Sequence, residues 1–172
     1  DEFTGFSNVN KQRNDEEELL LKYSDLVLGT SKFLMKKIMK FTTNYLFLPN
    51  AGDFNHFSTK PTQGMLTNTK KPIIGYFGSI AEWFDTELLE YLAKSRPDFS
   101  FIMIGHTFGS DIRNIQKLSN VKFLGERPYF ELPKYLHDFD VSLIPFRDIP
   151  LIEATHPVKI YEYFASGKLV VS

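Results

Sequence analysis

The residues best suited to chemistry lie near the end of the sequence, in the segment 154–168. Pro157 suits the first position of a helix, where its missing N–H leaves no hydrogen bond unmade. The backbone N–H groups of Val158 and Lys159 would then point out of the helix start and form an anion site, and the Lys159 ammonium adds a full charge beside it. Glu162 follows three residues later, on the same helix face and one turn deeper.

This arrangement suits a nucleoside diphosphate. The helix start and Lys159 would bind the diphosphate, and the Glu162 carboxylate would accept hydrogen bonds from two ribose hydroxyls, as acidic residues do in other nucleotide-binding folds. The same spacing also fits an explanation without a ligand, an ordinary helix ion pair between Lys159 and Glu162 worth about 0.3–0.5 kcal/mol. Spacing alone leaves both explanations open.

Composition narrows the class of protein. The chain has 172 residues, of which 42% are hydrophobic and 15% aromatic, so a packed core is expected rather than disorder. The net charge of −1 does not suggest nucleic-acid binding. Cysteine is absent, which excludes disulfides, thiolate metal sites and cysteine nucleophiles. The four histidines show no metal-ligand spacing, and no apolar run approaches the roughly 18 residues of a membrane span.

Other catalytic motifs do not fit. The sequence contains neither the G-x-S-x-G of a nucleophile elbow nor the G-x-x-x-x-G-K of a phosphate loop. Asp138 and Asp140 form an Asp-x-Asp, which holds a cation in some metal-dependent transferases. Here the pair precedes the apolar run 141–145 instead of following it, so we interpret it as a helix end and a strand start.

The elements that must position these residues follow from apolar runs and turn residues. Residues 1–14 are expected to be loop. Strands are expected over 26–28, 45–48, 73–77, 99–104, 121–124, 141–145 and 169–171. Helices are expected over 15–23, 31–41, 86–94, 111–118, 130–137 and 157–165, with Ser31 capping the second and Pro133 in the first turn of the fifth.

From residue 72 onward, near-continuous apolar strands alternate with helices, which predicts a doubly wound α/β domain with a parallel sheet covered on both faces. Such sheets bind ligands outside the carboxyl ends of their strands. The candidate loops are therefore 78–79, 105–106, 125–127 and 146–156. The segment 57–71 is rich in turn-forming residues and is the expected linker, with the domain boundary near residue 60. The chain begins at Asp1 and ends inside an expected strand, so we expect both ends to be cuts through a larger protein.

The segment 157–171, PVKIYEYFASGKLVV, resembles the pattern P-x-K-x-x-E-Y-x-A-x-G-K-P-V-V of GT-B glycosyltransferases, especially family 4 and its bacterial polysaccharide relatives. Residues 75–85 resemble the first strand and loop of the donor domain in a subgroup of that family. Residues 120–125 and 140–145 resemble its middle strands, and residues 26–31 and 48–53 resemble the end of the acceptor domain. The resemblance implies a Rossmann-like donor domain over 61–172, preceded over 1–60 by the end of an acceptor domain.

The resemblance also implies roles for individual residues. Those expected at the diphosphate are Gly78, Ser79, His156, Pro157, Val158 and Lys159. Glu162 would contact the ribose, and Arg127, Pro128 and Tyr129 would line the base pocket. Gly78 could equally be a strand-end turn, and Arg127 a surface charge. Ala154 stands where many family 4 enzymes have a second glutamate, so the donor-sugar contacts and the stereochemistry stay open, and no catalytic base is assigned.

The implied function is transfer of a sugar from a nucleoside-diphosphate sugar to a glycan or lipid-linked acceptor, with no metal and no other cofactor. The resemblance implies a cytoplasmic enzyme, and a polysaccharide pathway would allow peripheral association at the inner face of the membrane. The isolated fragment is expected to be inactive. Two other functions remain: a non-enzymatic α/β nucleotide-binding or interaction module, and a sugar-nucleotide epimerase of GT-B build.

Overall fold

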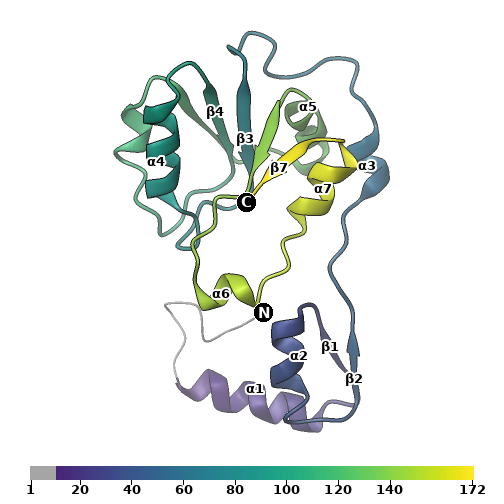
Figure 1. Cartoon of the computed structure of the whole chain (residues 1–172). Coiled ribbons are helices and arrows are strands. Elements are labelled where there is room, and N and C mark those ends of the chain that lie inside the picture. Colours follow the sequence, from purple (N-terminus) through teal and green to yellow (C-terminus); the bar gives the residue numbers. More distant parts are fainter. Residues whose placement is uncertain (1–10) are drawn as a thin grey trace. The chain divides into compact units, whose positions relative to one another are not determined.

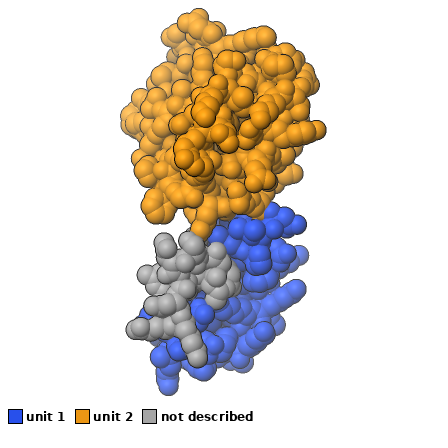
Figure 2. Space-filling view, turned by 90° about the vertical axis from the view of Figure 1, so that its left-hand side faces the viewer, with its two compact units in different colours: residues 1–51, 148–157 blue, residues 52–147, 158–172 orange. Residues whose placement is uncertain are grey.

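The computed structural model describes residues 11–172, so most of the loop expected over 1–14 lies outside the described residues. The chain forms two compact units, coloured separately in Figure 2. The first contains the chain up to Ala51 together with residues 148–157, and the second contains 52–147 together with 158–172. The functional boundary expected near residue 60 stays a prediction.

The first unit contains three helices and one pair of parallel strands within the described residues. They are α1 (Lys11–Tyr23), β1 (Val27–Gly29), α2 (Lys32–Ile38), β2 (Tyr45–Phe47) and α6 (Pro150–Glu153). Ser31 caps α2 as expected, since its side chain accepts a hydrogen bond of 3.2 Å from the N–H of Leu34. Leu34 and Ile38 bury their side chains against Leu21 and Ala154 to form the core of this unit.

The second unit contains the predicted parallel sheet. Its strands are β3 (Ile73–Phe77), β4 (Ser100–Ile104), β5 (Val121–Gly125), β6 (Val141–Leu143) and β7 (Leu169–Val171), in the spatial order β5-β4-β3-β6-β7. The chain moves outward from β3 to β5 and then returns to the other side of β3 (Figure 1). The strand order therefore reverses between β3 and β6, and the prediction of a doubly wound α/β domain is confirmed.

Helices cover both faces of this sheet, and every residue of β3 is buried. Ile73 and Phe77 pack with α3 (Phe54–Ser58), α5 (Leu132–Leu136) and α7 (Lys159–Ala165). Ile74 and Tyr76 point to the opposite face and pack with α4 (Thr86–Ser95). Burial on both sides explains why the strand is apolar throughout instead of alternating.

Several expected elements differ from the structure in length or in type. Helix α1 begins at Lys11, four residues earlier than expected, because Lys11, Gln12 and Arg13 are good helix formers although they carry no apolar pattern. The helix expected over 111–118 is only the 3-10 turn Ile115–Lys117. The Asp111 side chain accepts a hydrogen bond of 3.1 Å from the N–H of Arg113, and such local bonds compete with a helix.

The segment 57–71, the expected linker, makes contacts within the second unit, and its role as a linker stays a prediction. Phe57 belongs to α3 and is fully buried, and the N–H of Leu66 donates a 2.6 Å hydrogen bond to Asp138. The last helix, α7, begins at Lys159 with Val158 as its N-cap, so Pro157 does not occupy the first helical position. The carbonyl of His156 accepts a 2.7 Å hydrogen bond from the Asn50 side chain, which holds this part of the chain outside the helix.

Pro133 lies in the first turn of α5, as expected, after the 3-10 turn Tyr129–Glu131. No helix between residues 11 and 172 is long and apolar enough to cross a membrane.

Candidate functional site

A cavity of about 310 Å³ opens at the carboxyl ends of three adjacent strands. Its wall is formed by Phe77, Gly78, Ser79, Ile104, Gly105, His106, Glu126, Arg127, Tyr129 and Leu132. The loops that follow β3, β4 and β5 thus contribute together, at the edge where open α/β sheets bind ligands. Four of the predicted site residues, Gly78, Ser79, Arg127 and Tyr129, meet in this cavity.

Two glycines allow the loops after β3 and β4 to pack backbone against backbone. Gly78 and Gly105 have φ angles of +138° and +145°, which other residues rarely adopt. A Cβ at Gly105 would run into the carbonyl oxygen of Gly78. The adjoining loop is held by the buried Tyr76, whose hydroxyl donates a 2.8 Å hydrogen bond to the carbonyl of Ser79. Gly78 is therefore more than a strand-end turn, because the side chains of Lys159 and Tyr76 leave no room for a Cβ at this position.

Lys159 approaches Gly78 from α7, although it is not itself among the residues that line the cavity. A Cβ at Gly78 would lie 2.9 Å from Lys159 Cε and 3.1 Å from Nζ. The ammonium also lies 5.5 Å from the ring centre of Tyr76 and 5.1 Å from that of Phe146. Burial lowers the pKa of Lys159, and the Coulombic effect of Glu162 opposes that shift. The result is a poorly hydrated cation beside the backbone of Gly78, an arrangement suited to an anionic ligand.

Glu162 lies one turn deeper on α7 and is only 8% exposed. Burial raises the pKa of its carboxyl, and the Coulombic effects of Lys159 and His56 oppose that shift. Among the ion pairs of the described chain, none joins Glu162 to Lys159, so the ordinary helix pair is not formed. The carboxylate is held near positive charge without being bonded to it, which leaves its oxygens able to accept hydrogen bonds.

Arg127 and Tyr129 form the wall on the β5 side. The Arg127 guanidinium is fixed by two donated hydrogen bonds of 3.0 Å, one from Nε to the hydroxyl of Tyr135 and one from Nη1 to the carbonyl of Glu126. Arg127 is thus an anchored group and not a loose surface charge. Tyr129 is 49% exposed, and Pro128 precedes it at the cap of the 3-10 turn without lining the cavity.

Sequence reasoning missed His56, which belongs to α3. Its ring stacks on Tyr129 with a centroid distance of 4.7 Å and an angle of 15°. Its Nε2 lies 3.1 Å from the Tyr129 carbonyl oxygen. A signal for the helix that contains His56 was available in the sequence. Asp53, three positions earlier, is a typical helix-capping residue, and its side chain accepts a hydrogen bond from the N–H of His56. His106 and Glu126 were also not singled out, although both lie in loops that the predicted sheet edge had indicated.

The remaining predicted diphosphate residues divide between the units. Val158 begins the last stretch of the second unit and is the N-cap of α7. His156 and Pro157 belong to the first unit, so their contact with a diphosphate stays a prediction.

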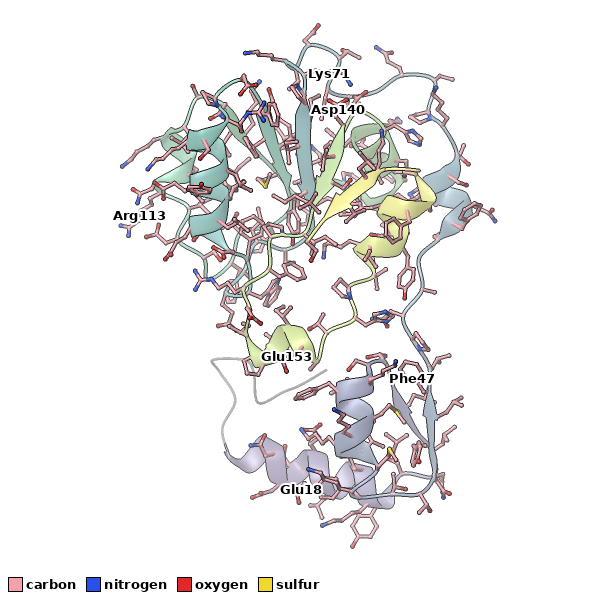
Figure 3. The ribbon with its side chains drawn as sticks, viewed as in Figure 1. Glu18, Phe47, Lys71, Arg113, Asp140 and Glu153 are labelled. Carbon is pink, nitrogen blue, oxygen red and sulfur yellow. The ribbon has the colours of Figure 1, made fainter. Side chains whose placement is uncertain are left out.

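The Asp-x-Asp pair serves the sheet, as the sequence suggested. Asp140 accepts a 2.7 Å hydrogen bond from the N–H of Ile73 and forms a 2.9 Å ion pair with Lys71. Figure 3 labels Lys71 and Asp140, which lie where β3 begins, at the end of the sheet away from the cavity. Across residues 11–172, no group of three or more histidine, cysteine or acidic side chains is placed to hold a metal ion.

Comparisons with protein families and with individual proteins both identify glycosyltransferases. The family model described as glycosyl transferases group 1 matches residues 71–172. Over 162 residues the chain is 25% identical to the putative teichuronic acid biosynthesis glycosyltransferase TuaH of Bacillus subtilis (strain 168), covering 88% of this chain and 41% of that protein.

Two solved structures share the fold. HepE from Anabaena, in complex with UDP and glucose, is 20% identical with a TM-score of 0.71, over 94% of this chain and 48% of that one. A point mutant of S. aureus TarM, in complex with fondaparinux, alpha-GlcNAc-glycerol and UDP, is 15% identical with a TM-score of 0.65, over 96% of this chain and 34% of that one. The chain therefore spans less than half the length of each of these proteins.

Proposed function

Because the chain belongs to the glycosyl transferases of group 1, we propose that it binds the nucleoside-diphosphate part of a sugar donor in the cavity at the carboxyl ends of β3, β4 and β5. The observation that carries this proposal is the position of Lys159, whose ammonium lies beside the backbone of Gly78, at the edge of the cavity, with the buried Glu162 one turn away.

Each part of the site suits one part of the donor. Lys159 neutralises the diphosphate at Gly78 and Ser79, where the absence of a side chain on the glycine admits phosphate oxygens. Glu162 accepts hydrogen bonds from the ribose hydroxyls. Tyr129 and the anchored Arg127 bind the base. HepE and TarM were both solved with UDP, which supports UDP as the nucleotide to test first.

The proposed reaction is transfer of the sugar to a glycan or lipid-linked acceptor. As the sugar–phosphate bond breaks, negative charge grows on the leaving diphosphate, and Lys159 stabilises that charge electrostatically. The cation comes from the protein, so we propose that no metal ion is required. This predicts that EDTA leaves nucleotide affinity and turnover unchanged.

The relatives also suggest where the reaction belongs. TuaH is named for teichuronic acid biosynthesis, and TarM was solved with a glycosylated glycerol, so a cell-envelope glycan is the proposed acceptor class. We propose that residues 1–60 end an acceptor domain and 61–172 belong to the donor domain. A cytoplasmic protein with peripheral membrane association fits this role.

A transfer assay with the full-length protein tests the proposal. UDP-glucose, UDP-N-acetylglucosamine and a GDP-sugar are each incubated with the protein and an envelope glycan acceptor, and nucleotide release and acceptor mass are followed. Gain of one sugar by the acceptor together with release of one nucleotide is the expected result. Conversion of the donor sugar without an acceptor would indicate an epimerase, and binding without turnover would indicate a binding module.

A further inference from the structure

His56 contacts the site from outside the cavity. It is not among the cavity-lining residues, yet its ring lies parallel to that of Tyr129, which is one of them. The ring of Phe57 meets Tyr129 at 86° with a centroid distance of 5.6 Å. Tyr129 is therefore supported by two rings of α3, while about half of its surface stays exposed.

Helix α3 is rigidly attached to the rest of the second unit. Phe57 is fully buried in the core, and its carbonyl accepts a 2.8 Å hydrogen bond from Ser166, the C-cap of α7. Gly52, just before α3, packs so closely on α7 that an added Cβ would lie 2.9 Å from Cβ of Tyr161. The short helix thus links α7, which carries Lys159 and Glu162, to the loop that carries Tyr129.

The chemistry of His56 goes beyond packing. An apolar ring would stack equally well, but His56 also places Nε2 3.1 Å from the Tyr129 carbonyl and so fixes the main chain of the loop. Burial raises the pKa of the Glu162 carboxyl, and the Coulombic effect of His56 is one of those that oppose this shift. One side chain therefore contacts the aromatic wall and influences the proposed ribose ligand.

We propose that His56 is a positioning residue for the nucleoside end of the donor: it holds the ring of Tyr129 at the angle at which a nucleobase stacks on its exposed surface. The inference rests on the proposed function and extends it to a residue outside the cavity. Stacking of a base on an aromatic side chain contributes a factor of roughly ten or more to affinity, so loss of the correct ring angle should be measurable.

The test compares UDP, GDP and inorganic pyrophosphate as ligands of the full-length protein by calorimetry. The variants are His56→Ala, His56→Phe, Tyr129→Ala and the double variant His56→Ala/Tyr129→Ala, each with its melting temperature recorded. We expect His56→Ala to weaken the preferred nucleotide about tenfold and leave pyrophosphate affinity unchanged. The double variant should bind no more weakly than Tyr129→Ala. His56→Phe, which retains the ring but lacks the hydrogen bond to the Tyr129 carbonyl, should recover part of the loss.

Three results would overturn the inference while leaving the proposed function intact. They are wild-type nucleotide affinity in His56→Ala, an equal loss for nucleotide and pyrophosphate, and a His56→Phe variant as weak as His56→Ala. A folded wild-type protein that binds neither UDP nor GDP would overturn the proposed function itself, and the role of His56 with it.

Discussion

Lys159 and Gly78 lie in direct contact, although 80 residues separate them in sequence: a single added carbon at Gly78 would lie 2.9 Å from Lys159 Cε. Under the proposed function, Lys159 supplies the cation and Gly78 the adjoining backbone for the diphosphate. Their contact joins the loop after β3 to the start of α7, across the position where the strand order reverses.

Substitution of Gly78 tests this contact. Gly78→Ala places a methyl group against Lys159 at a φ of +138°, so the ammonium must move. We expect UDP affinity to fall about tenfold and the free energy of unfolding to fall by about 1–3 kcal/mol, the usual range for a strained backbone conformation. Gly109→Ala is the matched control, because Gly109 also has a positive φ but nothing lies within 4 Å of the added carbon. The control should lose stability and retain affinity when both are measured by calorimetry and urea unfolding.

Lys159→Met separates binding from stability. Burial lowers the pKa of Lys159, so between that value and the ordinary 10.5 the unfolded chain binds more protons and wild-type stability rises with pH. Removing the buried charge should therefore raise the unfolding free energy at pH 8 and remove this dependence. UDP affinity should fall roughly 10- to 100-fold, since charge-assisted hydrogen bonds are lost. Lys94→Met removes an exposed helix ion pair with Glu90, so it should lower stability by less than about 0.5 kcal/mol and leave UDP affinity unchanged. Unchanged affinity in Lys159→Met would contradict the assigned role.

Glu162→Gln should also raise stability while it lowers UDP affinity, but with a different pH dependence. Burial raises the pKa of Glu162 above its ordinary 4.5, so the stability that the protonated carboxyl contributes is complete below pH 4.5 and is lost as pH rises through the folded-state pKa. The variant should be more stable than wild type at pH 7.5 and equal to it near pH 4. Urea unfolding at the two pH values measures this difference. UDP affinity should fall about tenfold, because an amide has one acceptor oxygen where the carboxylate has two. A variant that is less stable than wild type at both pH values would show that Glu162 is a structural residue.

Asp140→Asn perturbs the opposite end of the sheet. Burial would raise the pKa of the Asp140 carboxyl, but hydrogen bonds from Ile73 and Lys71 outweigh it and lower the pKa. This stability is present above the ordinary value of 3.8 and is lost as pH falls through the folded-state pKa. We expect the free energy of unfolding of the variant to be lower by about 1 kcal/mol at pH 7, a modest loss because the carboxylate is partly exposed. The difference should narrow in acid, because the wild-type carboxyl becomes protonated there. UDP affinity should not change, and a weaker affinity would mean that the two ends of the sheet are coupled.

The parts of the molecule that the sequence predicts well are those controlled by local patterns. The apolar runs of β3 and β4 and the spacing of Lys159 and Glu162 on one helix are visible without any long-range information. The Gly78 loop was also identifiable, because glycine after a buried strand marks the carboxyl edge of a parallel sheet.

The parts that were missed depend on contacts between distant segments. His56 and Tyr129 are 73 residues apart, and nothing in the composition of 57–71 shows that Phe57 is buried in the core and brings its neighbour His56 against Tyr129. The start of α7 was misplaced for a similar reason, because the hydrogen bond from Asn50 to the His156 carbonyl competes with a helix start at Pro157. Local propensity cannot anticipate a partner that lies 106 residues away.

The measurement that tests the central claim most directly is calorimetric titration of UDP and GDP into the full-length wild-type protein and into its Lys159→Ala and Glu162→Ala variants. Circular dichroism verifies that each variant is folded. The account predicts that one nucleotide binds the wild type with a one-to-one stoichiometry and that both substitutions weaken it at least tenfold. Failure of the folded wild-type protein to bind either nucleotide, or undiminished binding by both folded variants, would contradict it.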